Sequence, residues 1–264
     1  MASSPSALKS FVLASRPKTL IAGISPVVIG TVLAGTVSIP LFTCCLLFSV
    51  LIQIGTNYAN DYYDFVNGAD ANRVGPARAV ASGWLQPKQM KLAYQAVFAA
   101  AFLASIPLVA TCGLWALFFV LSSIAFGILY TGGPRPLGYL GLGDILVLIY
   151  FGPVAISGTY FVQTHEFPPV LLTLPPGLLS CAILTANNLR DVETDRAAGK
   201  NTLVVRFGTT FGQWEYAICI VTASLIPVIY GHYWTLLLLP FAWKQLDVPK
   251  TASLLIAYTA LFCI

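Results

Sequence analysis

The stretch Asn57-Tyr-Ala-Asn-Asp-Tyr-Tyr-Asp64 ends a long apolar segment with a cluster of amides and carboxylates. Asn57, Asp61 and Asp64 are separated by four and then three residues, which places their side chains on one face of an α-helix. Asn60 lies beside that face. Residues 41–54 before the cluster carry no charge, which predicts a helix that crosses lipid and brings the cluster to the water boundary. Because acids so close together repel one another, the cluster predicts a bound cation.

The composition is that of an integral membrane protein. Hydrophobic residues make up 57% of the 264 residues, charged residues make up only 9%, and the mean hydropathy is +0.80. Ordinary soluble domains carry roughly 25% charged residues. We therefore expect the chain to lie in a lipid bilayer and to bind no nucleic acid, while its sequence indicates no oligomeric state.

Apolar runs predict an all-α polytopic protein of about nine transmembrane helices in a single domain, 1–264. The expected spans are 19–38, 40–61, 91–111, 114–130, 141–162, 169–189, 212–231, 233–243 and 251–264. The eighth is shorter than the roughly 20 residues that a span needs. The ninth is also short and reaches the final residue, which suggests that the sequence stops inside that helix.

Basic residues set the expected orientation of these helices. All 14 lysines and arginines fall before the first span or in alternate connections. Because positively charged connections face the cytoplasm, we expect a cytoplasmic N-terminus in a cell inner membrane. The long connections near 65–90 and 192–210 would then cap an active site on the cytoplasmic side.

A second polar cluster ends the sixth expected span. In Ala186-Asn-Asn-Leu-Arg-Asp-Val-Glu-Thr-Asp195, the residues Asn187, Asp191 and Asp195 recur every four positions, again on one helical face. The clusters end the second and sixth spans, so we expect two related four-helix units plus a last helix, each unit supplying half of one site. Carboxylate oxygens combined with substrate phosphates suit Mg²⁺, and no Cys/His pattern competes for a softer metal.

Cationic residues follow each acidic cluster. Arg73 and Arg78 come after the first cluster, and Lys200 comes after the second. Arginine binds phosphate oxygens bidentately and lysine acts as a point charge, although the positive-inside rule alone also accounts for cations here. A metal, phosphate-binding cations and a lipid-lined body predict a substrate with a diphosphate head and a long apolar tail, such as a polyprenyl diphosphate.

The two clusters resemble the aspartate-rich motifs of the UbiA superfamily of intramembrane aromatic prenyltransferases. The first motif is Asn60-Asp61-x-x-Asp64 with Asp70 and Arg73, and the second is Asp191-x-x-x-Asp195 with Gly199, Thr202 and Leu203. Within the superfamily, three runs resemble the MenA group, the 1,4-dihydroxy-2-naphthoate polyprenyltransferases of menaquinone biosynthesis. These runs are Arg73–Gly83, Tyr130–Leu137 and Asn187–Asp195. Where the superfamily has a lysine four residues after Tyr130, this sequence has Pro134-Arg135, and Arg135 is expected to substitute.

The resemblance implies Mg²⁺-dependent transfer of a polyprenyl group from its diphosphate to 1,4-dihydroxy-2-naphthoate, with decarboxylation to demethylmenaquinone. The implied metal ligands are Asn60, Asp61, Asp64, Asn188, Asp191 and Asp195, and the four aspartates among them are the implied catalytic residues. The implied diphosphate-binding residues are Arg73, Arg78, Arg135 and Lys200. The residues implied to contact substrate or stabilise an allylic cation are Asn57, Asp70 and Tyr130.

Two other functions are compatible with parts of this pattern. Another aromatic acceptor, such as 4-hydroxybenzoate or homogentisate, would use the same metal and diphosphate chemistry. A secondary transporter would also show internal repeats and kinked helices. Transport sites lie near the bilayer midplane, whereas the acids here gather at one end of the expected spans, which favours the enzyme.

Overall fold

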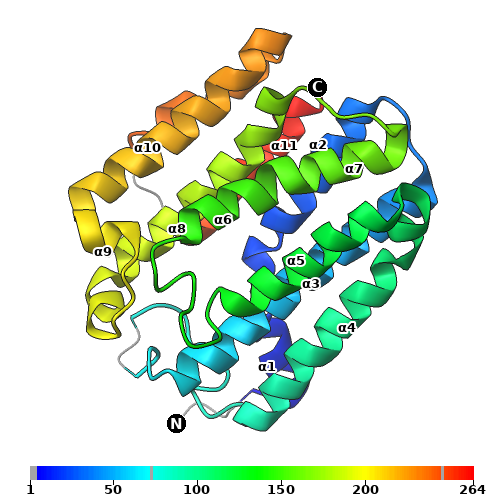
Figure 1. Ribbon diagram of the computed structural model, residues 1–264. Coiled ribbons are helices and arrows are strands. Elements are labelled where there is room, and N and C mark those ends of the chain that lie inside the picture. The colour runs from blue at the N-terminus through cyan, green and yellow to red at the C-terminus, as the bar shows by residue number, and fades with distance from the viewer. Residues whose placement is uncertain (1–4, 72–73, 245–246) are drawn as a thin grey trace.

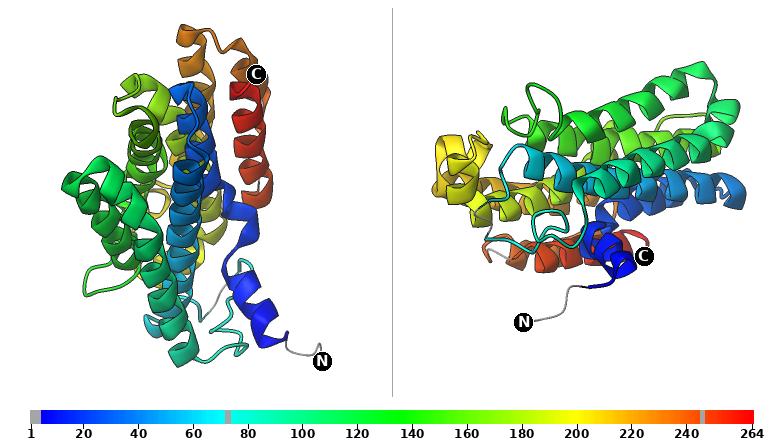
Figure 2. Two further views of the ribbon diagram at one scale, coloured as in Figure 1. Left: turned by 90° about the vertical axis from the view of Figure 1, so that its right-hand side faces the viewer. Right: turned by 90° about the horizontal axis from the view of Figure 1, so that it is seen from below.

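The computed structural model describes residues 5–71, 74–244 and 247–264. These ranges contain helices and connecting turns but no β-strand. Figures 1 and 2 show the long helices side by side in one bundle, with the C-terminus at the opposite end from α1. The prediction of an all-α protein is confirmed for the part of the chain that the structure describes.

The α-helices have the following bounds: α1 Ala7–Ala14, α2 Ile21–Ala34, α3 Ile39–Val66, α4 Pro87–Cys112, α5 Leu114–Leu129, α6 Gly143–Ile149, α7 Ala155–Thr164, α8 Val170–Ala197, α9 Leu203–Phe207, α10 Thr209–Leu225 and α11 Val248–Phe262. A π-helical turn, Tyr150–Val154, joins α6 to α7. The 3₁₀ segments are Pro17–Thr19, Ile226–Tyr230 and Tyr233–Phe241.

Within the described ranges, five helices are long and apolar enough to cross a membrane. They are α3, α4, α8 and two continuous helical segments. Segment 143–164 comprises α6, the π-helical turn and α7, and segment 209–230 comprises α10 and the 3₁₀ segment that follows it. A sixth arises if α1 and α2, which meet at a bend of 51°, count as one span. The apolar helices α5 and α11 are shorter, so by length and composition the described chain has five to six spans.

The expected span at 233–243 is a 3₁₀ segment that covers only Tyr233–Phe241. A 3₁₀ helix rises about 2.0 Å per residue, so these nine residues fall well short of a hydrocarbon core of about 30 Å. Pro240 lies inside the segment and lacks the backbone N–H that an α-helix would need there. An apolar composition alone does not supply the length of a span.

Two packed regions surround the middle of the bundle. One joins α8, α10 and α11 through buried side chains that include Leu179, Ile220 and Leu255. The other joins α3 to α4 and includes Tyr58 and Phe98. These regions hold the ends of α3 and α8 in place, and both ends carry the acidic clusters.

Close backbone contact fixes α8 against the π-helical turn. A Cβ added at Gly152 would lie 2.9 Å from the carbonyl oxygen of Thr173, and one at Gly177 would overlap the carbonyl oxygen of Leu148. Only glycine leaves room for backbones at this separation. The contact therefore sets the position of α8 relative to α6 and α7.

Candidate active site

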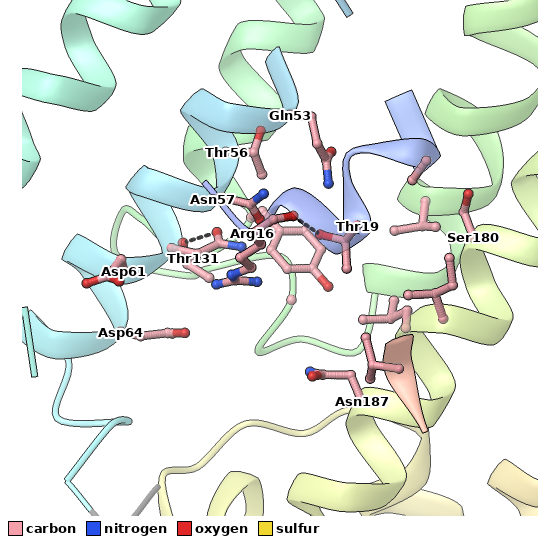
Figure 3. A pocket seen from close by; sticks show the side chains of 18 of the residues that line it. Arg16, Thr19, Gln53, Thr56, Asn57, Asp61, Asp64, Thr131, Ser180 and Asn187 are labelled. Carbon is pink, nitrogen blue, oxygen red and sulfur yellow. Dashed lines mark hydrogen bonds between the residues drawn. The ribbon is translucent and has the colours of Figure 1, made fainter. Parts of the chain in front are cut away.

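A cavity of about 520 Å³ lies between α3 and α8. On α3 its lining runs from Ile52 to Asp64, and on α8 it runs from Ser180 to Asp195. Figure 3 shows Asp61 and Asp64 on one side of the cavity and Asn187 on the other. On both helices, the lining changes from apolar or neutral side chains to acidic ones toward the C-terminal end, so the cavity is graded from apolar to charged.

The polar side chains near the C-terminal end of α3 are buried and face the cavity. Asn57, Asn60, Asp61 and Asp64 are each less than 9% exposed, and all four line the cavity. Asn57 Nδ2 donates a hydrogen bond to the carbonyl oxygen of Ser15 at 2.9 Å. Asn60 Oδ1 accepts one from the hydroxyl of Thr131 at 2.8 Å. Both amide side chains thus join α3 to neighbouring segments.

Asp61 anchors the connection between α3 and α4. Its Oδ2 and Oδ1 accept hydrogen bonds from the backbone N–H groups of Ala79 and Val80, both at 2.9 Å. Hydrogen bonds to an ionised carboxylate are among the stronger ones in proteins. This acid therefore holds the connection over the end of α3.

Asp64 is surrounded by donors from three connections. The hydroxyl of Tyr139 donates to Oδ1 at 3.0 Å, and Lys200 Nζ lies 2.9 Å from the same oxygen. Arg78 Nη2 donates to Oδ2 at 3.3 Å, while Arg78 Nε lies 3.7 Å from Asp70 Oδ1. Because Asp64 and Arg78 are both buried, their charges compensate each other in a region of low dielectric.

The α8 cluster faces the same cavity. Asn188, Asp191 and Asp195 all line it, and Asn188 and Asp191 are buried. Asp191 is held by Arg190, whose Nε lies 2.7 Å from Oδ1 and whose Nη2 lies 2.5 Å from Oδ2. A bidentate arginine is a strong and directional partner for a carboxylate.

Two tyrosines near the acids remain protonated. Burial raises the pKa of Tyr139 above its ordinary value, and the charge of Asp64 raises it further. Burial also raises the pKa of Tyr130, which lines the cavity, with smaller contributions from nearby acids. Both phenols are therefore hydrogen-bond donors at neutral pH, which is how Tyr139 acts toward Asp64.

The donor atoms suit Mg²⁺, although cations of the chain now contact them. Among the described residues, no three His, Cys, Asp or Glu side chains are grouped closely enough to hold a metal ion. Lys200 and Arg78 instead contact Asp64, and Arg190 contacts Asp191. Magnesium usually takes one or two protein carboxylates and completes its shell with water and substrate phosphates. The carboxylate and amide oxygens on the two helices match that requirement.

Among the described residues, two that were expected at the site lie outside the cavity lining. Arg135 is exposed and lies outside the cavity lining. Asp70 is buried and also lies outside the lining, where it contacts Arg78. Arg73 lies outside the described residues. The remaining expected residues line the cavity: Asn57, Asn60, Asp61, Asp64, Arg78, Tyr130, Asn188, Asp191, Asp195 and Lys200.

Sequence reasoning missed several residues that line the cavity, among them Arg16, Tyr139 and Arg190. Arg16 has a left-handed backbone, with φ 53°, at the break between α1 and the following 3₁₀ turn, and Figure 3 shows its side chain at the pocket. The positive-inside rule explains its charge as an orientation signal alone. Arg190 adjoins Asp191, and neighbours on a helix do not ordinarily face each other, so helical spacing gave no reason to pair them.

Residues 23–260 match the UbiA prenyltransferase family. The chain is 38% identical over 224 residues to a 1,4-dihydroxy-2-naphthoate octaprenyltransferase of Mycobacterium tuberculosis, covering 83% of this chain and 77% of that protein. It is 40% identical over 224 residues to the Escherichia coli protein of the same name, covering 80% and 72%. Among solved structures, a UbiA homolog from Archaeoglobus fulgidus bound to DMAPP and Mg²⁺ gives a TM-score of 0.65 at 14% identity, covering 97% of this chain and 99% of that one.

Proposed function

The chain belongs to the UbiA prenyltransferase family, and on this basis we propose that it transfers a polyprenyl group from polyprenyl diphosphate to 1,4-dihydroxy-2-naphthoate. The prenyl group replaces the carboxylate, which leaves as carbon dioxide, and diphosphate is released, which gives demethylmenaquinol, the hydroquinone form of demethylmenaquinone. Relatives of this chain at 34–40% identity carry the name 1,4-dihydroxy-2-naphthoate octaprenyltransferase, which supports this acceptor over 4-hydroxybenzoate or homogentisate.

The graded cavity is the observation that carries the proposal. Along α3 and α8 the lining passes from Ile52 and Ile183 to the acids Asp64 and Asp195. Twelve residues of α-helix span about 18 Å, so one cavity offers an apolar wall and a charged end at the separation of a lipid tail and its head group. A polyprenyl diphosphate has this shape, and its diphosphate would lie at the acidic end.

The residues proposed to hold Mg²⁺ are Asn60, Asp61, Asp64, Asn188, Asp191 and Asp195. When bound, the metal supplies positive charge that stabilises the departing diphosphate. Lys200 and Arg78, already in the cavity wall, bind further diphosphate oxygens. Arg73 and Arg135 are proposed as additional diphosphate ligands from the sequence resemblance alone.

The same chain shields the cation that remains after the diphosphate departs. The ring of Tyr130 lines the cavity, and an aromatic face attracts a cation. The connection anchored by Asp61 covers the acidic end and excludes water that would otherwise capture the cation. Asn57 and Asp70 are proposed to assist by positioning the neighbouring side chains.

The chain is an integral membrane protein, and we further propose its finer topology. Nine helical segments, the eighth of them the short 3₁₀ segment Tyr233–Phe241, would form two related units of four plus a last helix, within one domain, 1–264. The equivalent positions of the acidic clusters at the ends of α3 and α8 support this repeat. The alternate placement of basic residues supports an active site that faces the cytoplasm of a cell inner membrane.

The test uses membranes that contain the full chain, a labelled polyprenyl diphosphate, and 1,4-dihydroxy-2-naphthoate or 4-hydroxybenzoate as acceptor. We expect demethylmenaquinol only with Mg²⁺ and only with the naphthoate. Asp191→Ala should abolish the product, whereas Glu193→Gln, which changes an exposed acid on the same helix, should retain it. Product from 4-hydroxybenzoate alone would overturn the acceptor, and no product from either would overturn the enzyme.

A further inference from the structure

Arg190 is the cationic partner of the buried Asp191 on α8. Its guanidinium contacts both carboxylate oxygens of Asp191 and also donates from Nη2 to Asn187 Oδ1 at 2.5 Å. Asp191 is buried, while the Arg190 side chain is 29% exposed. A buried carboxylate without a counter-charge would be costly, so Arg190 neutralises this half of the site.

The connection between α3 and α4 keeps the Arg190 guanidinium in place. A Cβ added at Gly75 would lie 2.7 Å from Nη2 of Arg190, so the backbone of that connection packs directly on the guanidinium. Arg190 also lines the cavity, as does Pro76 in the same connection. The arginine therefore lies between α8, the covering connection and the space available to a substrate.

A metal ion and Arg190 compete for Asp191 through the repulsion of their charges, although each carboxylate oxygen keeps a second lone pair. Magnesium binds oxygen ligands at about 2.0–2.1 Å, and the guanidinium already lies against both Oδ atoms. Their like charges repel at this separation, which raises the free energy of the doubly occupied state. Binding of a metal to Asp191 therefore favours release of the arginine from this carboxylate.

We propose that Arg190 is the resident counter-cation of Asp191, which Mg²⁺ displaces and which then binds the diphosphate of the substrate. This inference rests on the proposed function. The side chain is long, partly exposed and at the cavity wall, and its planar fork matches phosphate oxygens. Arg190 thus opposes binding of the metal alone and favours binding of the metal together with diphosphate.

The test measures binding of Mn²⁺ to the purified full chain by electron paramagnetic resonance, with and without inorganic pyrophosphate. Arg190→Gln should bind Mn²⁺ alone at least about fivefold more tightly than the wild type, a modest coupling between two competing cations. The same variant should bind pyrophosphate in the presence of Mn²⁺ more weakly than the wild type by at least about the same factor. Arg190→Lys keeps the charge but loses the planar fork of the guanidinium. Its two affinities should lie between those of the wild type and those of Arg190→Gln.

Arg196→Gln is the matched control, because Arg196 lies on the same helix, is exposed and pairs with the exposed Glu193. Its two affinities should equal those of the wild type. An Arg190→Gln variant with unchanged Mn²⁺ affinity, or with both affinities reduced, would overturn the inference, since a merely structural arginine would move both in one direction. If Arg190→Gln shifts the two affinities in opposite directions but the wild type transfers no prenyl group to the naphthoate, the role of Arg190 stands. The proposed acceptor is then overturned.

Discussion

Lys200 reaches Asp64 across the cavity, with its Nζ 2.9 Å from Oδ1. The lysine follows α8, and the aspartate belongs to the last two turns of α3. The ammonium also lies over the ring of Tyr139, 4.9 Å from its centre, and that residue donates its hydroxyl to the same carboxylate. Asp64 is therefore the residue at which the two acidic helix ends and the connection after α5 are joined.

Replacing Asp64 should reduce both stability and activity. Asp64→Asn leaves the buried Arg78 and the mostly buried Lys200 without their shared negative charge. Removing one partner of a buried ion pair costs about 3 kcal/mol or more, so we expect a lower melting temperature in detergent. Prenyl transfer should fall by at least about 100-fold, as for loss of an important electrostatic group. Glu166→Gln, at an exposed acid, should change neither quantity.

Asp61→Asn should loosen the connection that covers the acidic end. An asparagine retains one acceptor oxygen, so one of the two hydrogen bonds from Ala79 and Val80 is lost. The expected cost is about 1–3 kcal/mol. Hydrogen exchange should then be faster at these two amides than in the wild type, while amides in the middle of α4 exchange as before. Unchanged exchange at Ala79 and Val80 would show that Asp61 does not anchor the connection.

Tyr139→Phe should lower activity without changing its pH dependence. The variant loses the hydrogen bond to Asp64 but keeps the ring beneath Lys200, and a single hydrogen bond to a charged group contributes about 1.5–3 kcal/mol. Because the pKa of Tyr139 is raised above its ordinary value of about 10, its phenol stays protonated up to that pH. The pH–rate profiles of the two enzymes should therefore be parallel between about pH 6 and 9, and a shift of the alkaline limb would contradict this assignment.

Gly177→Ala should destabilise the contact between α8 and the π-helical turn. The new methyl group would overlap the backbone carbonyl of Leu148, which cannot rotate away as a side chain could. Overpacking of this kind costs about 1–3 kcal/mol. Gly158→Ala is the matched control, since a Cβ there meets nothing within 4 Å. We expect a lower melting temperature for Gly177→Ala only. Equal melting temperatures of the two variants would contradict the close backbone contact between α8 and the π-helical turn.

Helical periodicity predicted the acidic faces because it depends only on local spacing. Asn57, Asp61 and Asp64 lie together on a buried face as expected, although α3 continues to Val66 rather than ending near residue 61. Hydropathy found most of the long helices for the same reason. It overestimated 233–243, where the apolar residues form a short 3₁₀ segment, because composition reports burial or lipid contact and not helix length.

Contacts between distant segments could not be predicted from spacing. Tyr139 meets Asp64 because its connection is held to the residues after α8 by hydrogen bonds from Asn201 N to Tyr139 O and from Arg206 Nη2 to Leu140 O. The same connection leaves Arg135 exposed, although the resemblance placed it at the diphosphate. Only the folded chain shows which cations of a connection point inward.

The π-helical turn Tyr150–Val154 sets the rotation of α6 relative to α7. A π turn contains about one residue more than an α turn, and each α-helical residue advances the rotation by about 100°. Deleting one residue there would restore a regular helix but would turn α6 by about that angle against α7. Leu146, Val147 and Tyr150 would then leave the cavity wall that they now form. The π-helical turn thus sets the rotation at which the continuous helical segment 143–164 packs on α2 through α7 and lines the cavity through α6.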